Sequence, residues 1–304
     1  MDDVFLDGVF VSRDEARVSA HDAGFQHGVG LFETMLAVGG DDGPRVLWLG
    51  EHMSRLTESA GELGLSDAID PAGLGEAVLE TVRRSGLAQT GADMARVRLT
   101  MTGGDLNMLS RAEGSRARPT VLIQAQPATV YPEPMFTDGV AVVFADTRAN
   151  PLDPMASHKT LNYWWRLREL QSAAGKGAGE AVVLQVTNHV CGGCVSNLFV
   201  VRNGVLSTPI ARGEEVQGGT PSPVLPGVTR ARVIEWAQSG SLGFERRMLT
   251  VDDLLDADEV FATNSSWGVL PIVRVEREGV GDGKVGEVTR MMRERWLGSF
   301  SVSR

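Results

Sequence analysis

A lysine and a tyrosine four residues apart form the segment of this chain with the clearest chemical potential. They lie in the run Ser157-His158-Lys159-Thr160-Leu161-Asn162-Tyr163, where a helical stretch is expected to begin. A lysine amine can form a Schiff base with an aldehyde cofactor, and the hydroxyl of Tyr163 could then reach a phenolic oxygen of that cofactor. Because most lysines are solvated surface charges, this interpretation depends on other segments that point to the same chemistry.

Three further segments have the residue types that bind a phosphate group. In Leu225-Pro226-Gly227-Val228-Thr229-Arg230 a glycine opens a helix, so that free backbone N–H groups and the helix dipole favour an anion. Thr263-Asn264-Ser265-Ser266 places small hydrogen-bond donors after a predicted strand, and Arg55 lies one position away from an apolar helix stripe. Each segment alone also fits a plainer interpretation, namely a helix cap, a surface loop and a solvated arginine.

Composition and charge narrow the classes of protein to which the chain can belong. Its 304 residues are 42% hydrophobic and 22% charged, which suits one large or two modest globular domains. The net charge of −10 argues against a nucleic-acid surface, which needs basic residues. The two cysteines, Cys191 and Cys194, are too few for a disulfide scaffold. Because we find neither a signal peptide nor an apolar run long enough to span a membrane, we expect a cytoplasmic protein.

The order of the predicted elements indicates an α/β (α+β) chain of two domains. Asp7-Gly8 predicts a hairpin between two short strands, apolar spacing predicts a helix over 51–65, and Asp70-Pro71 is a typical helix start. Three prolines within residues 127–134 indicate a semi-rigid connector. We therefore predict a small α/β domain over residues 1–126, a linker over 127–136 and a larger domain over 137–304.

Together these segments resemble those of the fold-type IV pyridoxal-phosphate enzymes, the class IV aminotransferases. That family includes branched-chain and D-amino-acid aminotransferases and aminodeoxychorismate lyase. The resemblance extends from about residue 4 to about residue 290, with the motifs in the same order and spacing. The motifs are Asp22-Ala23-Gly24-Phe25, Gly28-Val29-Gly30-Leu31-Phe32-Glu33-Thr34, His52-Met53-Ser54-Arg55-Leu56, Lys159-Thr160-Leu161-Asn162-Tyr163, Ser196-Asn197-Leu198-Phe199, Thr208-Pro209, Leu225-Pro226-Gly227-Val228-Thr229-Arg230 and Thr263-Asn264-Ser265.

The resemblance implies pyridoxal 5'-phosphate as the cofactor and assigns roles to individual residues. Lys159 matches the lysine that binds the cofactor as an imine and moves the substrate's α-proton, and Tyr163 matches the tyrosine near the phenolic oxygen. The resemblance also implies a homodimer and a larger domain shaped as a pseudo-barrel. The expected phosphate site consists of Arg55, Gly227, Val228, Thr229, Thr263, Asn264 and Ser265, and the expected substrate contacts are His27, Phe32 and Arg98. For His27, a core or capping role is an equal alternative.

The chain departs from the family pattern at Gly192. The family normally places a glutamate five residues before the asparagine of Ser196-Asn197, where it pairs with the pyridine nitrogen of the cofactor. Residues 181–213 contain no acidic side chain. A water or backbone group could substitute, a carboxylate from Glu214 or Glu215 could fold back, the reaction could need a weaker electron sink, or the cofactor could be lost.

Two smaller features surround this departure. Gly192 lies within Cys191-Gly192-Gly193-Cys194, and a tetrahedral zinc would need a second pair of ligands that the sequence lacks. We therefore interpret the motif as a tight turn with incidental cysteines and expect no metal. The segment 214–223 is rich in glycine and proline and is predicted to be either a lid or a surface loop.

These observations predict a pyridoxal-phosphate-dependent aminotransferase that moves an amino group between a small amino acid or amine and a 2-oxo acid. One alternative is a lyase of the aminodeoxychorismate type, in which Lys159 abstracts a proton and drives elimination. The other is a degenerate, non-catalytic paralogue that has lost the glutamate at Gly192. The sequence does not distinguish L from D substrates.

Overall fold

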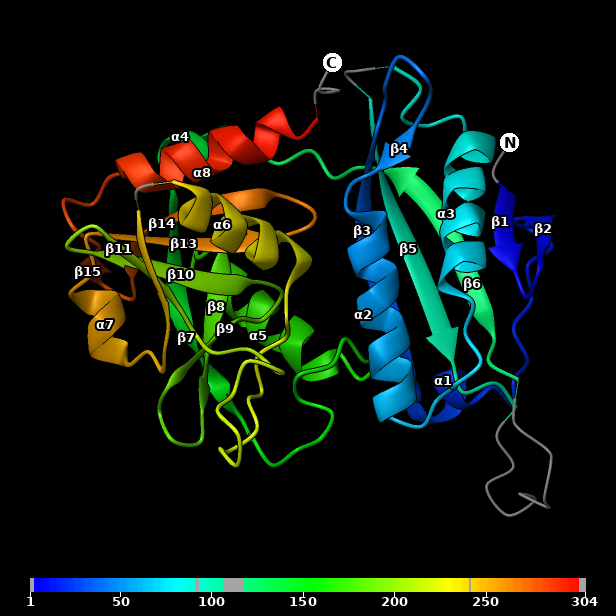
Figure 1. Cartoon of the computed structure of the whole chain (residues 1–304), viewed down its shortest axis with the longest axis horizontal. Helices are drawn as coiled ribbons and strands as arrows, with labels where there is room; N and C mark the ends of the chain where they lie inside the picture. The colour runs from blue at the N-terminus through cyan, green and yellow to red at the C-terminus, as the bar shows by residue number, and fades with distance from the viewer. Residues whose placement is uncertain (1–2, 91–92, 106–117, 241, 301–304) are drawn as a thin grey trace. The chain divides into compact units, whose positions relative to one another are not determined.

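The computed structural model describes residues 3–90, 93–105, 118–240 and 242–300 (Figure 1). Within it the chain divides into two compact units. Unit 1 consists of Met1–Thr129, His158–Asn162 and Phe300–Arg304, and unit 2 consists of Val130–Ser157 and Tyr163–Ser299. Each unit is described by itself below.

An antiparallel sheet with strand order β2-β1-β6-β5-β3-β4 forms the framework of unit 1. The predicted hairpin at Asp7-Gly8 is confirmed, since β1 pairs with β2 and both turn residues have positive φ values, 50° and 100°. Strands β3 and β5 pair over their whole length, from Gly30 opposite Thr102 to Val38 opposite Met94. The strands are β1 (Asp3–Leu6), β2 (Val9–Ser12), β3 (Gly30–Val38), β4 (Arg45–Val46), β5 (Met94–Thr102) and β6 (Val121–Pro127).

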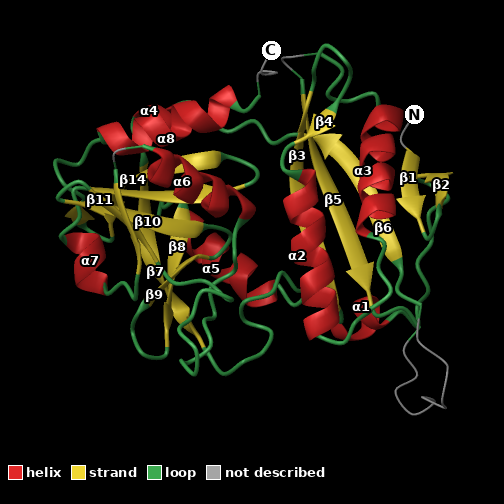
Figure 2. Ribbon diagram, in the orientation of Figure 1, coloured by secondary structure: helices red, strands yellow, loops and turns green. Residues whose placement is uncertain are grey.

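Two amphipathic helices, α2 (Leu49–Glu62) and α3 (Pro71–Ser85), pack side by side on this sheet (Figure 2). The predicted start of α3 is confirmed: Asp70 accepts a hydrogen bond from the Ala72 amide at 3.0 Å, and Pro71 occupies the first turn. The apolar stripes of both helices join the strands in one buried core, in which Leu56 and Val78 are fully covered. A short helix, α1 (Ala23–His27), precedes β3.

Unit 2 is built on a nine-stranded mixed sheet with order β12-β11-β10-β13-β14-β7-β8-β9, and β15 pairs with β14 at the side. The β14–β7, β7–β8 and β11–β12 pairs are parallel, and the remaining pairs are antiparallel. The strands are β7 (Val140–Ala149), β8 (Glu180–Gln185), β9 (Val190–Gly193), β10 (Asn197–Arg202), β11 (Val205–Thr208), β12 (Gly243–Arg246), β13 (Glu259–Asn264), β14 (Gly268–Val275) and β15 (Glu278–Gly279).

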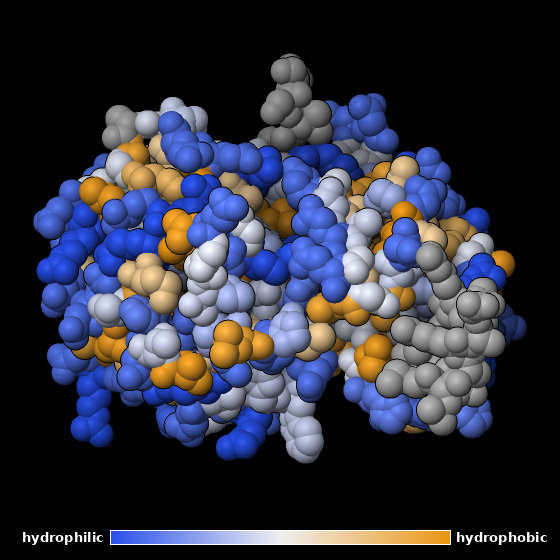
Figure 3. Space-filling view, turned by 60° about the horizontal axis from the view of Figure 1, so that its bottom comes forward, coloured by the Kyte–Doolittle hydropathy of each residue, from blue (hydrophilic) through white to orange (hydrophobic). Residues whose placement is uncertain are grey.

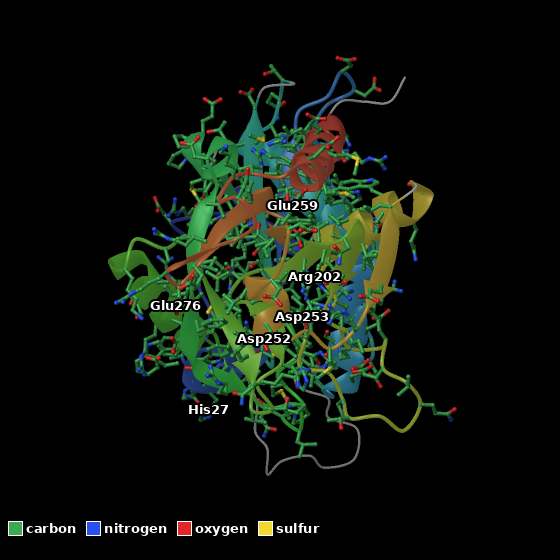
Figure 4. All side chains as sticks on the ribbon, turned by 90° about the vertical axis from the view of Figure 1, so that its left-hand side faces the viewer. His27, Arg202, Asp252, Asp253, Glu259 and Glu276 are labelled. Atoms are coloured by element: carbon green, nitrogen blue, oxygen red, sulfur yellow. The ribbon has the colours of Figure 1, made fainter. Side chains whose placement is uncertain are left out.

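Helices cover this sheet, and polar contacts fix their ends. Glu259 of β13 accepts hydrogen bonds from the amides of Val288 and Thr289, at 3.0 and 2.8 Å, and so caps the first turn of α8 (Figure 4). Thr250 and Asp253 form a capping box at α7. The helices of unit 2 are α4 (Pro134–Thr137), α5 (Trp164–Gly175), α6 (Val228–Ser239), α7 (Val251–Leu255) and α8 (Glu287–Gly298).

The segment around Lys159 differs from the sequence prediction in two ways. The helix begins five residues later than the lysine, at Trp164, and Lys159 itself lies in an extended segment. That segment pairs with β3, because Phe32 N donates to Lys159 O and Leu161 N donates to Gly30 O, both at 2.9 Å. Residues 158–162 therefore belong to unit 1, whereas the predicted larger domain of 137–304 included them.

Hydrophilic side chains make up most of the face in Figure 3, with hydrophobic ones interspersed. Among the described residues no helix combines the length and the apolar character that crossing a membrane requires.

Candidate active site

In unit 1 the amine of Lys159 lies over the ring of Phe32. The distance from Lys159 Nζ to the ring centroid is 4.4 Å, and the guanidinium carbon of Arg98 lies 3.9 Å from the same centroid. Phe32 is 4% exposed and comes from β3, whereas Arg98 comes from the neighbouring strand β5. The predicted cofactor lysine therefore contacts Phe32, a predicted substrate residue, and Arg98, a second one, contacts the same ring.

The glycine at position 30 allows the extended segment around Lys159 to pack closely against β3. A Cβ atom there would lie 2.5 Å from the carbonyl oxygen of Met101 and 2.7 Å from a methyl carbon of Leu161. Gly30 therefore lets the Lys159 segment lie directly against β3.

The third predicted substrate residue is placed at the end of a helix. His27 is the last residue of α1, and its side chain is exposed (Figure 4). It is neither a core residue nor the capping residue of α1, because the capping position after it is taken by Gly28. Its role in substrate binding stays a prediction.

Arg55 belongs to a buried charged cluster that the sequence analysis did not foresee. Its Nε donates to Glu33 Oε1 at 2.8 Å, its Nη2 donates to the second carboxylate oxygen at 2.5 Å, and His52 Nδ1 lies 2.7 Å from that same oxygen. Burial alone raises the pKa of Glu33, but Arg55 and His52 outweigh it and hold that pKa at about 2. Burial lowers the pKa of His52, against the attraction of Glu33, so the imidazole is neutral at physiological pH.

This cluster fixes the orientation of the Arg55 guanidinium through a bidentate pair. After burial, the positive charges of Arg55 and Lys159 also help to lower the pKa of His52, so the lysine lies in the same neighbourhood. The glutamate could have been suspected from the sequence, because Glu33 is an acidic residue within the largely apolar segment that forms β3. In the structure it is 1% exposed.

In unit 2 the start of α6 has the features of an anion site. Gly227 is the N-cap residue and has no side-chain capping bond, so the first-turn amides have no side chain to cap them. The hydroxyl of Thr229 is buried and has no hydrogen-bond partner among the described residues, and the same holds for the hydroxyl of Thr263. Buried hydroxyls are nearly always paired, so two unpaired ones in the segments expected to hold a phosphate fit that ligand.

Asn197 joins these two segments. It pairs with Thr263 across β10 and β13, and its Nδ2 donates to Leu225 O at 2.9 Å, just before the α6 start. A Cβ atom on Gly227 would lie only 1.9 Å from Asn197 Oδ1, so a larger residue at 227 would collide with the asparagine. The sequence motif contained Asn197, but its positioning role emerges only from the structure.

Asn264 shapes the second of these segments. Its Oδ1 accepts hydrogen bonds from the amides of Ser266 and Trp267, at 2.9 and 3.0 Å. Its Nδ2 donates to the carbonyl of Val195 at 3.3 Å. The side chain of Asn264 is therefore used to hold the loop, and its predicted contact with the cofactor stays a prediction, as does that of Ser265.

Tyr163 and Arg166 donate to one carbonyl group, that of Cys194. The distances are 3.3 Å from the Tyr163 hydroxyl and 2.9 Å from Arg166 Nη1. Both residues lie at the start of α5, and Cys194 follows β9, so these bonds connect the helix to the turn that contains Gly192. The predicted contact of Tyr163 with the cofactor's phenolic oxygen stays a prediction.

The backbone at Gly192 leaves no room for a side chain. Its φ is 155°, and a Cβ atom would lie 2.7 Å from the Ser196 carbonyl oxygen. One alternative from the sequence, a carboxylate folding back from the 214–223 loop, is wrong in this structure. Glu214 pairs with Arg230 at 2.6 Å, and Glu215 accepts from two amides of its own loop.

A different carboxylate, that of Glu180, lies against this turn. It is fully buried and accepts hydrogen bonds from the amides of Ala181, Cys194 and Val195 and from the Ser196 hydroxyl. Burial raises its pKa, although these donors oppose the shift. The signal in the sequence was an acidic residue directly before the apolar run Ala181-Val182-Val183-Leu184.

The two cysteines are free and buried. Burial raises the pKa of each thiol to about 12, so both are protonated at neutral pH and are poor nucleophiles. In the described part of the chain, no group of three or more His, Cys, Asp or Glu side chains is arranged to hold a metal ion.

Comparisons with known proteins agree with this architecture. The family described as "Amino-transferase class IV" matches residues 30–275. The branched-chain-amino-acid aminotransferase of Escherichia coli (strain K12) is 28% identical over 305 residues, which covers 99% of this chain and 93% of that protein.

Two solved structures are similar over nearly the whole chain. A branched-chain aminotransferase of Thermoproteus uzoniensis with norvaline has a TM-score of 0.84 and 26% identity, covering 97% of this chain and 93% of that one. The 4-amino-4-deoxychorismate lyase of Pseudomonas aeruginosa has a TM-score of 0.79 and 28% identity, covering 97% and 98%. The two-unit α/β fold is thus that of the fold-type IV enzymes, and the chain belongs to the class IV aminotransferases.

Proposed function

We propose that this protein is a pyridoxal-phosphate-dependent aminotransferase that moves an amino group between an amino acid or amine and a 2-oxo acid. The observation that carries the proposal is the pair of buried, unpaired hydroxyls of Thr229 and Thr263 in the segments expected to hold a phosphate. An unpaired buried hydroxyl costs about 1–3 kcal/mol, so a chain that keeps two of them gains a compensating ligand.

Pyridoxal phosphate would supply the aldehyde that accepts the amino group and the ring that withdraws electrons from the substrate's α-carbon. In this proposal Lys159 carries the cofactor and moves the α-proton, since a lysine amine can act both as a nucleophile and as a base. The Phe32 ring, 4.4 Å from Lys159 Nζ, limits the directions that the amine can take.

We assign the phosphate to the start of α6, where the backbone amides of Val228 and Thr229 and the Thr229 hydroxyl would donate to it. The unpaired hydroxyl of Thr263, at the end of β13, would be a further donor. Asn197 holds this segment in place. Arg55 is the cationic candidate, with Glu33 fixing its orientation.

We assign the substrate carboxylate to Arg98, whose guanidinium can bind a carboxylate through two parallel hydrogen bonds. It lies on the same Phe32 ring as Lys159, so a bound amino acid could present its α-carbon to the lysine while its carboxylate contacts the arginine. His27 remains a further candidate.

A lyase of the aminodeoxychorismate type is the second candidate function. The similarity to the Pseudomonas aeruginosa lyase over nearly the whole length of both chains supports it. It would use the same lysine as a base but end in elimination rather than in transfer of the amino group.

A half-reaction screen tests the proposal and separates the two functions. The purified protein is loaded with pyridoxal phosphate and mixed in turn with L- and D-amino acids and simple amines, without a 2-oxo acid. The aminotransferase proposal expects conversion of the cofactor to pyridoxamine phosphate and release of the matching 2-oxo acid. No conversion with any donor, together with elimination from aminodeoxychorismate, would favour the lyase. The expected homodimer and the cytoplasmic location stay predictions.

A further inference from the structure

Residue 192, where the family pattern places the glutamate that pairs with the pyridine nitrogen, is a glycine in this chain, and its backbone crowds any side chain. Gly192 has a φ of 155°, and any Cβ would crowd the Ser196 carbonyl oxygen at 2.7 Å. The backbone conformation at residue 192, and not only the identity of that residue, therefore disfavours the family's glutamate.

The carboxylates nearby already have other partners. Glu180 uses both oxygens for the amides and the hydroxyl of the turn that follows β9. Glu214 pairs with Arg230 and Arg246, at 2.6 and 3.0 Å. Glu169 accepts from Asp146 N and Thr147 Oγ1. None of these groups could turn towards a ligand without leaving several donors unpaired.

Besides the Glu180 carboxylate, a guanidinium also contacts this turn. Arg166 is half-buried, and its Nη1 donates to Cys194 O at 2.9 Å, two residues beyond Gly192. Its guanidinium carbon lies 4.4 Å from the centroid of the Trp165 ring, which restricts its movement. In the described part of the chain Arg166 forms no ion pair and no second hydrogen bond. The N–H groups of its Nε and Nη2 can therefore donate to a ligand. The positive charge of Arg166 lowers the pKa of the Cys191 and Cys194 thiols, against the larger effect of burial.

From these contacts we propose that Arg166 takes the place of the missing glutamate and donates a hydrogen bond to the pyridine nitrogen of the cofactor. This inference rests on the proposed function. A guanidinium is always protonated and can only donate, so its partner must be an unprotonated, accepting nitrogen. A carboxylate would impose the opposite state.

The exchange has a chemical consequence. A ring whose nitrogen carries no proton withdraws less electron density from the substrate. Of the alternatives that the sequence left open, this corresponds to a reaction with a weaker electron sink. Proton transfer then depends more on the placement of Lys159, and the substrates would be those whose α-proton is comparatively easy to remove.

Nitrogen NMR of the bound cofactor tests the proposal without relying on activity. Wild type and the variants Arg166→Glu and Arg166→Gln are loaded with pyridoxal phosphate that is isotope-labelled at the pyridine nitrogen. The proposal expects an unprotonated nitrogen in wild type, with a resonance that does not change with pH. In Arg166→Glu the resonance shifts to that of a protonated nitrogen, and in Arg166→Gln it titrates with pH.

The matched control is Arg168→Glu, an equal change of charge at an exposed position of the same helix, which should leave the wild-type resonance in place. A protonated nitrogen in wild type, or a resonance unchanged in both Arg166 variants, would overturn the proposal. If Arg166→Glu does not fold, wild type and Arg166→Gln still decide the question. Wild-type protein that binds no pyridoxal phosphate at all would overturn the proposed function and this inference together.

Discussion

Removing the hydroxyl of Thr229 should change the stability of the apoprotein and the affinity for pyridoxal phosphate in opposite directions. Thr229→Val keeps the shape of the side chain but removes a buried oxygen that has no partner among the described residues. The apoprotein should become more stable by about 1–3 kcal/mol, since an unsatisfied buried polar group is lost. A hydrogen bond to a charged phosphate contributes about 1.5–3 kcal/mol, so the affinity for pyridoxal phosphate should fall about 10- to 150-fold. Thr263→Val should behave in the same way.

Urea unfolding of the apoprotein and titration with pyridoxal phosphate measure the two effects. Thr81→Val is the matched control, because Thr81 is equally buried but its hydroxyl donates to Ala77 O at 2.7 Å. That variant should lose about 0.5–1.5 kcal/mol of stability and keep the affinity of wild type. A less stable Thr229→Val apoprotein with unchanged affinity for pyridoxal phosphate would refute the reasoning.

Two further predictions concern the buried cluster and the departure from the family pattern. Because the pKa of Glu33 is held at about 2, below its ordinary value of 4.5, its contribution of about 3 kcal/mol is present above that ordinary value and is lost as the pH falls towards 2. Urea unfolding across this range should show that loss in wild type and not in Glu33→Gln; equal slopes in both would contradict it. Gly192→Ala should cost about 1–3 kcal/mol more than Gly8→Ala, since both have positive φ but only Gly192 of these two meets a neighbour within 4 Å. Equal unfolding free energies for the two variants would contradict an effect of the close contact with Ser196.

Local sequence signals predicted the regular elements of unit 1 well. The Asp7-Gly8 turn has the positive φ values that its residues allow, and the Asp70-Pro71 start caps α3 as expected. The family itself was predicted from motif order and is confirmed by the match over residues 30–275.

The elements that failed are those that depend on distant partners. Hydrogen bonds with Gly30 and Phe32 hold the segment around Lys159 extended, and the helix starts at Trp164. No local pattern could show these partners, because they lie more than a hundred residues away in the sequence.

The site shows the same division. Motif spacing selected the threonines whose hydroxyls the structure leaves unpaired. Three other features depend on tertiary contacts, which a single sequence does not reveal. They are the pairing of Glu33 with Arg55 and His52, the ion pair of Glu214 with Arg230, and the direction of the Arg166 side chain.

The central claim is that Lys159 carries pyridoxal phosphate, and covalent trapping tests it most directly. The protein is saturated with pyridoxal phosphate, reduced with borohydride, digested and mapped by mass spectrometry. The account predicts a pyridoxyl group on Lys159, and in Lys159→Ala no stoichiometric adduct at any other position. An adduct on another lysine of the wild type, or none in protein that has bound the cofactor, would contradict it.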